Sequence, residues 1–172
     1  MIDSDKIIQI LYPILQKGFC VKVLTGVSVR RLLEDQFKLS SDFVDVKIST
    51  VFLNGKAVDN IDSAIVTDNC ELALSGAMPG FVGAAMRRGG YYSSMRSAVS
   101  HIEQLSIPPI IEGMVKIKLY NTLIQSLGLE FARRGIIVSK TDAAGLLSAE
   151  LSPFINTSLD TNIPDSYLIT IK

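Results

Sequence analysis

The sequence predicts an α+β fold, and three observations in chain order lead to it. Apolar residues recur at three- and four-residue spacing over residues 4–17, as on one face of a helix. Residues 50–53 and 71–74 have the length and apolar character of strands. Asn54-Gly55 directly follows the first strand and is a strong turn signal, because both residues tolerate positive φ. Helix and strand patterns therefore mix along one chain, as in an α+β domain with a mixed sheet.

The amino-terminal elements follow from local pattern. We expect the helix over 4–17 to end at Gly18, and an alternating strand over 19–25 to follow it. Ser28 then opens a short helix, because its hydroxyl can accept a hydrogen bond from the first turn. Residues 43–53 are rich in β-branched and aromatic side chains, which predicts one strand or two strands that meet at a bend.

The second half of the chain begins with a segment of different composition. Residues 76–110 are rich in glycine, methionine and arginine, and we interpret them as an insertion or lid whose part over 93–105 is helical. After it the pattern predicts, in order, a strand over 115–119, a helix over 122–134, a strand over 136–139, a helix capped by Thr141 and ending at Ala149, a loop over 151–165, and a last strand over 167–171.

Length and composition bound the function. At 172 residues the chain suits one domain with an elaboration. Lysine plus arginine and aspartate plus glutamate are equal at 17 each, so we expect neither nucleic acid nor a membrane as a partner. The apolar fraction of 48% favours a buried subunit interface in addition to a core. Acidic residues at the amino terminus and the lack of a long apolar run predict a cytoplasmic protein.

The two cysteines and three of the aspartates do not have the spacing of a metal site or a redox pair. Cys20 and Cys70 lack the close spacing of a zinc site or redox pair, so we interpret them as small apolar residues in a reducing compartment; a disulfide or thiol chemistry is the alternative. Asp59, Asp62 and Asp68 lack the spacing of a calcium loop and are interpreted as turn residues rather than metal ligands. We expect no cofactor and no bound metal.

Four segments within about residues 19–80 form a combined pattern. They are Val29-Arg30-Arg31-Leu32-Leu33, Val51-Phe52-Leu53-Asn54-Gly55-Lys56-Ala57-Val58, Asp68-Asn69-Cys70-Glu71-Leu72-Ala73-Leu74 and Met78-Pro79-Gly80. Together they resemble the β-grasp sulfur carriers of molybdopterin and thiamine synthesis, which are ubiquitin-like. The resemblance implies a β-grasp core in which a small mixed sheet wraps one short helix. It also implies a partner protein that docks on the sheet and the glycine-rich tail.

The chain departs from that family at the tail. The carriers end in two glycines whose terminal carboxylate is adenylated and converted to a thiocarboxylate. Here Pro79-Gly80 and Gly89-Gly90 are both internal, so the intact chain cannot carry out the carrier chemistry. Cleavage after Gly90 would create a carrier-like end, which we keep as a second alternative function. The predicted organisation is an amino-terminal helix over 1–18, a β-grasp-like core over 19–80, an insertion over 81–110 and a carboxy-terminal α/β extension over 111–172, which is either a separate domain or part of the same sheet.

The leading hypothesis is a non-catalytic interaction or scaffold protein that forms homo-oligomers through the glycine-rich segment, where small residues allow close packing. The first alternative is an enzyme or binding protein for a small anionic metabolite, with Arg87, Arg88 and Arg96 as anchors and His101, the single histidine, as acid or base. The residues predicted to form the ligand site or interface are Gly76, Met78, Pro79, Gly80, Gly83, Arg87, Arg88, Gly89, Gly90, Tyr91 and Arg96.

Overall fold

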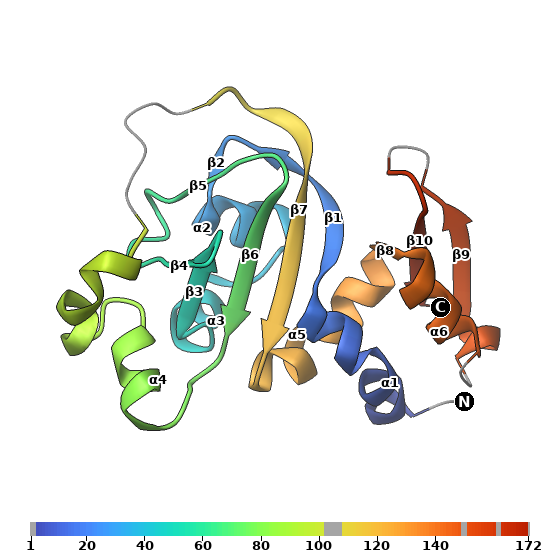
Figure 1. The fold of residues 1–172 in the computed structure, drawn as a ribbon, viewed down its shortest axis with the longest axis horizontal. Coiled ribbons are helices and arrows are strands. Elements are labelled where there is room, and N and C mark those ends of the chain that lie inside the picture. The colour runs from blue at the N-terminus through green and yellow to red at the C-terminus, as the bar shows by residue number, and fades with distance from the viewer. Residues whose placement is uncertain (1–2, 102–107, 149–150, 161–162, 172) are drawn as a thin grey trace.

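The computed structural model of the chain describes residues 3–101, 108–148, 151–160 and 163–171 (Figure 1). The protein is α+β, with a mostly antiparallel mixed sheet whose strand order is β4-β3-β6-β7-β1-β8-β10-β9 and a separate two-stranded sheet of β2 and β5. The strands are β1 (Phe19–Thr25), β2 (Val27–Ser28), β3 (Thr50–Leu53), β4 (Lys56–Ala57), β5 (Ile65–Val66), β6 (Cys70–Ser75), β7 (Ile111–Tyr120), β8 (Ile136–Ser139), β9 (Ile155–Leu159) and β10 (Ser166–Ile171).

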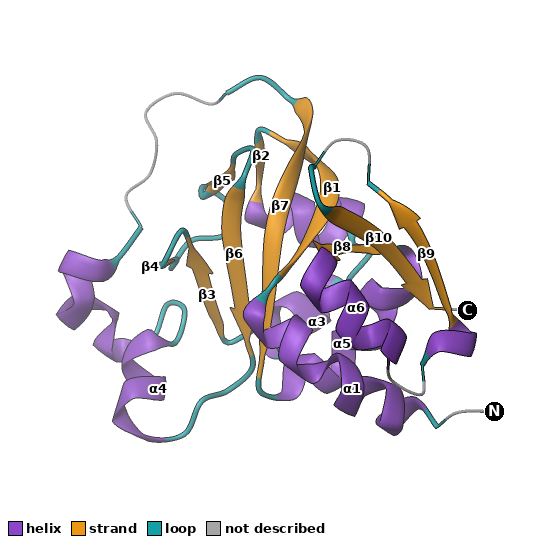
Figure 2. Ribbon diagram, turned by 45° about the vertical axis from the view of Figure 1, so that its right-hand side comes forward, coloured by secondary structure: helices purple, strands orange, loops and turns teal. Residues whose placement is uncertain are grey.

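The helices lie around this sheet (Figure 2). The view separates α4, at one end of the molecule, from a group formed by α1, α5 and α6. None of the described helices is both long and apolar enough to cross a bilayer. The helices are α1 (Ser4–Lys17), α2 (Val29–Arg31), the π-helix η1 (Leu32–Gln36), α3 (Ser41–Val46), α4 (Gly80–Met86), the 3₁₀ helix η2 (Tyr91–Val99), α5 (Thr122–Arg134), α6 (Lys140–Ser148) and the 3₁₀ turn η3 (Ser152–Phe154).

Several predicted elements are confirmed with their caps. Helix α1 ends at Gly18, whose amide donates to the carbonyl of Ile14 over 2.8 Å. The Ser28 hydroxyl accepts from the amide of Arg31 and so opens α2. Asn54 and Gly55 have φ of 50° and 77°, which closes the β3–β4 hairpin with the predicted turn.

The strand prediction over 43–53 is right only for its last four residues. Residues 41–46 form α3, because the Ser40 hydroxyl accepts from the amide of Phe43 and caps a helix. Strand β3 begins only at Thr50. Local capping therefore outweighs the β propensity of Val44 and its neighbours, which pack as one turn of helix.

The carboxy-terminal part holds two further corrections. Residues 155–159, predicted as loop, form β9, which pairs antiparallel with β10 and is the end strand of the sheet. The cap of α6 is Ser139 rather than Thr141, since the amide of Asp142 donates to the Ser139 hydroxyl over 3.2 Å. The helix predicted over 93–105 is the 3₁₀ helix η2 as far as Val99, and its part over 102–107 lies outside the described residues.

The central strand β7 of the sheet comes from residues 111–120, far along the chain from its neighbours β1 and β6. Strand β7 lies between β6, to which it is parallel, and β1, to which it is antiparallel. The sheet therefore includes strands from both sides of residue 80. One face of these strands is buried, and there Phe131 of α5 packs against Phe19 and Phe37 with ring centroids 5.3 and 4.9 Å apart.

Candidate interaction surface

Residues 76–99 form a projection that we call the arm (Figure 1). It leaves the end of β6, forms α4, turns at Arg87–Gly90 and continues as η2. The backbone packs very closely where α4 begins, because a Cβ on Gly83 would lie 2.0 Å from the carbonyl oxygen of Met78. Gly89 has φ of +60° in the turn between the two helices, a conformation that favours glycine. Gly83 therefore allows the close backbone packing, and Gly89 allows the turn between the two helices.

Arg96 is buried in the arm and holds it together. Its side chain is only 4% exposed, and its Nε donates to the carbonyl of Ala85 over 2.7 Å. Its Nη2 donates to Asp59, which also accepts from the amide of Gly89 over 3.0 Å. A buried guanidinium needs such partners, since burying a charge without them is strongly unfavourable. One aspartate from the loop after β4 therefore ties both helices of the arm to the body.

Arg88 makes a second set of ties. Its amide donates to the carbonyl of Ser49 over 2.8 Å, and its Nη2 donates to the carbonyl of Val44 over 3.0 Å. The same Nη2 lies 3.6 Å from Asp45, which is also bound by Arg30. Burial lowers the pKa of Arg88, and the charge of Asp45 opposes that change. We call Asp45, Asp59, Arg88 and Arg96 together the clasp.

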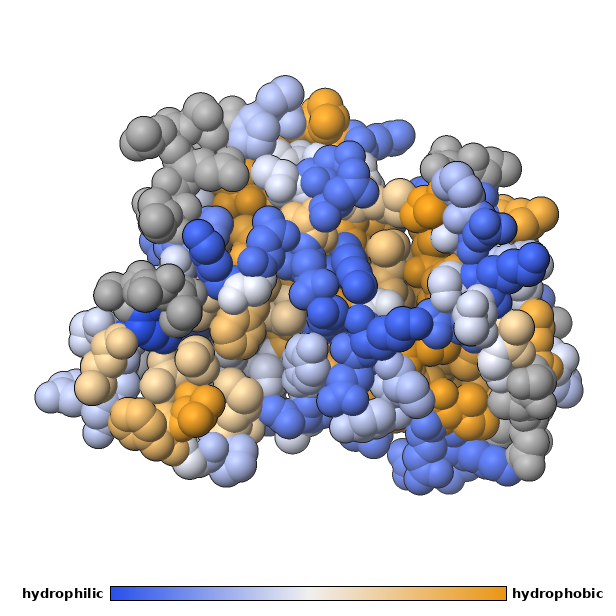
Figure 3. All heavy atoms as spheres, in the orientation of Figure 1, coloured by the Kyte–Doolittle hydropathy of each residue, from blue (hydrophilic) through white to orange (hydrophobic). Residues whose placement is uncertain are grey.

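The outer side of the arm carries apolar and aromatic side chains. Phe81 is 65% exposed and Tyr91 is 91% exposed. The Tyr92 ring lies against both, with centroids 5.5 Å from Phe81 and 5.1 Å from Tyr91. In Figure 3, hydrophobic residues gather at the lower left of the molecule, over α4. We call this set the arm patch, and its members are Phe81, Val82, Tyr91, Tyr92 and Met95.

The arginines predicted as anion anchors have different settings. Arg88 and Arg96 donate to protein acceptors in the clasp, so an anion would have to compete with Asp45 and Asp59 for them. Arg87 is exposed, and its guanidinium forms no ion pair with the residues that the structure describes. The three side chains therefore do not form one anion site: Arg88 and Arg96 tie the arm to the body, and the Arg87 side chain takes no part in this tie.

His101 lies at the edge of the sheet, where its amide donates to the carbonyl of Ala57 over 2.7 Å. The preceding residue, Ser100, forms a bridge with Ala57 and its hydroxyl is within 3.4 Å of Nη1 of Arg96. The chain after the arm therefore covers the short edge strand β4. Covering an edge in this way protects it from pairing with other chains.

The three aspartates between β4 and β6 have separate roles: Asp59 and Asp62 precede β5 and Asp68 follows it. Asp59 belongs to the clasp, Asp62 accepts from Nε of Arg30 over 2.6 Å, and Asp68 accepts from the amide of Met114 over 2.7 Å. Within the described part of the chain no three potential metal ligands come together. Both cysteines are free thiols, and burial raises the pKa of Cys20 and of Cys70, which disfavours the reactive thiolate.

Sequence reasoning missed the acidic half of the clasp. Asp45 and Asp59 are separated from Arg88 and Arg96 by tens of residues, and no local pattern links them. The equal numbers of acidic and basic residues in the chain do not indicate which of these residues pair. The burial of Arg96 could not be predicted from its segment, whose other residues are mostly exposed or half-buried. It depends on the fold, which brings the arm next to Asp59.

No family model, no curated protein and no solved structure matches the chain.

Proposed function

We propose that the chain is a non-catalytic interaction protein that associates with a second copy of itself through the arm patch. The observation that carries the proposal is the inverted arrangement of the arm, where Arg96 is 4% exposed and Tyr91 is 91% exposed. A charged side chain inside and aromatic side chains outside are the reverse of an ordinary surface helix. Aromatic side chains with neighbouring methionine are the residues enriched at protein interfaces.

The properties of the whole chain favour a second copy as the partner. The formal net charge is zero, so two copies do not repel one another. The members of the arm patch are exposed, and three of them, Phe81, Tyr91 and Tyr92, are joined by ring contacts, which allows patch-to-patch contact about a two-fold axis. The clasp holds α4 and η2 in place before association, so little conformational entropy is lost on binding.

We also infer that the body is a β-grasp-like core. Support comes from the mixed strand order β3-β6-β7-β1, with a parallel pair at its centre and a short helical segment, α2 with η1, in the connection between β1 and β3. This core takes its strand β7 from residues 111–120, beyond the segments that resemble the sulfur carriers. The processed carrier has less support, because Gly90 leads directly into η2, whose Arg96 belongs to the clasp.

The proposal is tested by measuring the mass of the full chain in solution. Size-exclusion chromatography with light scattering over a concentration series should give twice the 18.7 kDa chain mass. The double substitution Phe81→Glu with Tyr91→Glu should give the monomer, because it places two charges in an apolar contact. The matched control is Val46→Glu on α3, which changes an apolar residue that is 70% exposed but lies outside the arm. A wild-type chain that stays monomeric over the whole series would refute self-association.

A further inference from the structure

The outer edge of β1 is only half paired. On one side β1 pairs with β7 along its whole length, but on the other side it meets β8 only at Cys20 and Ile137. Strand β8 cannot extend further along β1, because Gly135 directly before it is the carboxy-terminal cap of α5. Beyond Cys20, no strand of the described chain pairs with this edge of β1.

The hydrogen bonds of Met114 show which way the backbone of Lys22 points. Lys22 lies opposite Met114 in the β1–β7 ladder. The amide of Met114 donates to Asp68, and its carbonyl accepts from the amide of Asn69, each over 2.7 Å. Both groups of Met114 therefore point toward β6, and its pair with Lys22 is of the non-hydrogen-bonded kind. The amide and carbonyl of Lys22 consequently point away from β7, into the gap between β1 and β8.

A side chain takes the place of a strand at the next such position. Gln36 accepts from the amide of Leu24 over 2.8 Å and donates to the carbonyl of Leu24 over 2.9 Å, as a neighbouring strand would do. It is the last residue of η1, where the amide of Phe37 donates to the carbonyl of Leu32 in the wider π-helical pattern. The side chain of Gln36 thus occupies a position where a neighbouring strand would otherwise pair.

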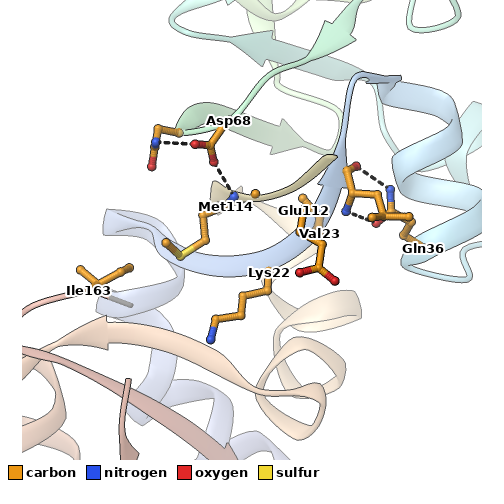
Figure 4. Close-up of a pocket in the computed structure, with 10 residues that line it drawn as sticks. Lys22, Val23, Gln36, Asp68, Glu112, Met114 and Ile163 are labelled. Atoms are coloured by element: carbon orange, nitrogen blue, oxygen red, sulfur yellow. Dashed lines mark hydrogen bonds between the residues drawn. The ribbon is translucent and has the colours of Figure 1, made fainter. Parts of the chain in front are cut away.

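Two cavities meet at this edge, one on each face of the sheet. Figure 4 shows the larger of them. Both are lined by Lys22, Val23 and Gln36. The larger, of about 850 Å³, lies on the face of Met114 and contains the exposed carboxylate of Glu112. The ammonium group of Lys22 is bound to Asp160 over 3.0 Å, which leaves the larger cavity with an acidic character. The smaller, of about 360 Å³, is lined by the apolar side chains of Phe37, Phe131, Ile137 and Leu168, with Gln36 and the basic Arg134 beside them.

We propose that this edge of β1 binds an extended segment of a partner protein as an added strand. The backbone of the segment pairs with Lys22 and, after Gln36 moves aside, with Leu24. Side chains of a strand alternate between its two faces, so successive residues of the segment enter the two cavities in turn. The matching sequence has apolar residues toward Phe37 and Phe131 and basic residues toward Glu112.

The test uses the full chain and a capped hexapeptide of alternating valine and lysine with a fluorescent label. Fluorescence anisotropy should show saturable binding, and amide hydrogen exchange should show slower exchange at Lys22 and no change in the arm. Two further hexapeptides carry N-methyl groups on either the valines or the lysines. One of the two should fail to bind, because methylation removes the donors that face β1. Equal binding of all three peptides, unchanged exchange at Lys22 when the peptide saturates, or no binding to the folded chain at millimolar peptide would each overturn the proposal.

Variants separate this site from the rest of the molecule. Gln36→Ala should tighten binding by about threefold or more, because the peptide no longer displaces a hydrogen-bonded side chain. Glu112→Lys should weaken binding by about tenfold through like-charge repulsion, while Asp42→Lys, the same reversal of charge on an exposed residue of α3, should leave binding unchanged. The arm variant with Phe81→Glu and Tyr91→Glu should bind the peptide normally, so this site and the proposed self-association can fail independently. Weaker binding by Gln36→Ala, or equal effects of the two lysine substitutions, would count against an added strand.

Discussion

The sheet and the arm are stabilised in opposite ways. In the sheet, side chains such as Leu72, Val115 and Ile117 are fully buried, and charged residues such as Lys116 lie on the other face. In the arm, Arg96 is buried and Phe81 is exposed. The first arrangement is stabilised by removal of apolar area from water and does not need a partner. The second leaves apolar area in water and holds its shape by hydrogen bonds and ion pairs.

This difference separates what folds the chain from what the chain presents to others. A polar tie such as the clasp fixes geometry but contributes less stability than an apolar core of equal size. An arm fixed in this way can keep its aromatic side chains exposed without collapsing onto the body. We therefore expect core substitutions to lower global stability, clasp substitutions to loosen the arm, and patch substitutions to change association alone.

The largest effect should come from the same kind of truncation made in the two regions. Leu72→Ala, at a fully buried position of β6, should lower the free energy of unfolding by about 2–5 kcal/mol, because it leaves a cavity in a close-packed core. Phe81→Ala removes a larger side chain, but the free energy of unfolding of the monomer should change by less than about 0.5 kcal/mol, since that ring is already in water. Urea unfolding at low protein concentration measures both. A comparable loss from Phe81→Ala would mean that the arm patch is part of the core.

The degree to which each region could be predicted follows the same division. The helix over 122–134 with Gly135 behind it and the Asn54-Gly55 turn are correct, because their signals are local and near in sequence. Strand β9 was missed, because its exposed, polar residues give no clear alternation and it is defined by its pairing with β10. The position of β7 between β6 and β1 was not predictable either, since strand order is not encoded in periodicity.

The candidate site shows the same limit. The composition of residues 76–96 predicted that their glycines and aromatic residues belong to one surface, and these residues lie in one arm of the structure. The inward direction of Arg96 and the outward direction of Tyr91 could not be read from the sequence, because a 3₁₀ helix with an irregular residue does not keep a helical period. The role of Gln36 at the edge of β1 had no sequence signal, since a glutamine at a helix end is common on any surface.

A smaller effect, confined to the arm, should follow from opening the clasp. Arg96→Met removes the guanidinium that binds Asp59 and the carbonyl of Ala85, and we expect a local loss of about 1–3 kcal/mol. Amide hydrogen exchange should become faster in α4 and η2, while β6 keeps its protection. Arg87→Met is the matched control, because it removes an exposed arginine from the same segment. If Arg96→Met instead speeds exchange throughout the sheet, the arm and the sheet are one cooperative unit and the division between them is wrong.

The smallest effect should come from an ion pair that is more exposed than the clasp. Lys17 of α1 binds Asp142 of α6 over 2.9 Å, and the Lys17 side chain is largely in water. Burial raises the pKa of Asp142, but the hydrogen bonds from Lys17 and Ser139 outweigh it, so the pKa of Asp142 is lowered overall. A lowered pKa in the folded state means that the carboxylate stabilises the fold above its unfolded pKa of about 3.9, and that this stabilisation is lost as pH falls through the folded pKa.

Asp142→Asn should therefore lower the free energy of unfolding by about 0.5–1 kcal/mol at neutral pH, a small value because solvent screens the pair. The difference from wild type should shrink as the pH falls below about 4, where the unfolded carboxyl takes up its proton, and should vanish below the lowered pKa of Asp142 in the folded state. Urea unfolding of both proteins over a pH series measures this difference in free energy of unfolding. Glu112→Gln is the control for neutralising an exposed carboxylate. A difference that stays constant from neutral to acidic pH would show that the loss comes from a changed hydrogen bond between the side chain of residue 142 and the Ser139 hydroxyl that caps α6. The ion pair between α1 and α6 would then contribute nothing to the fold.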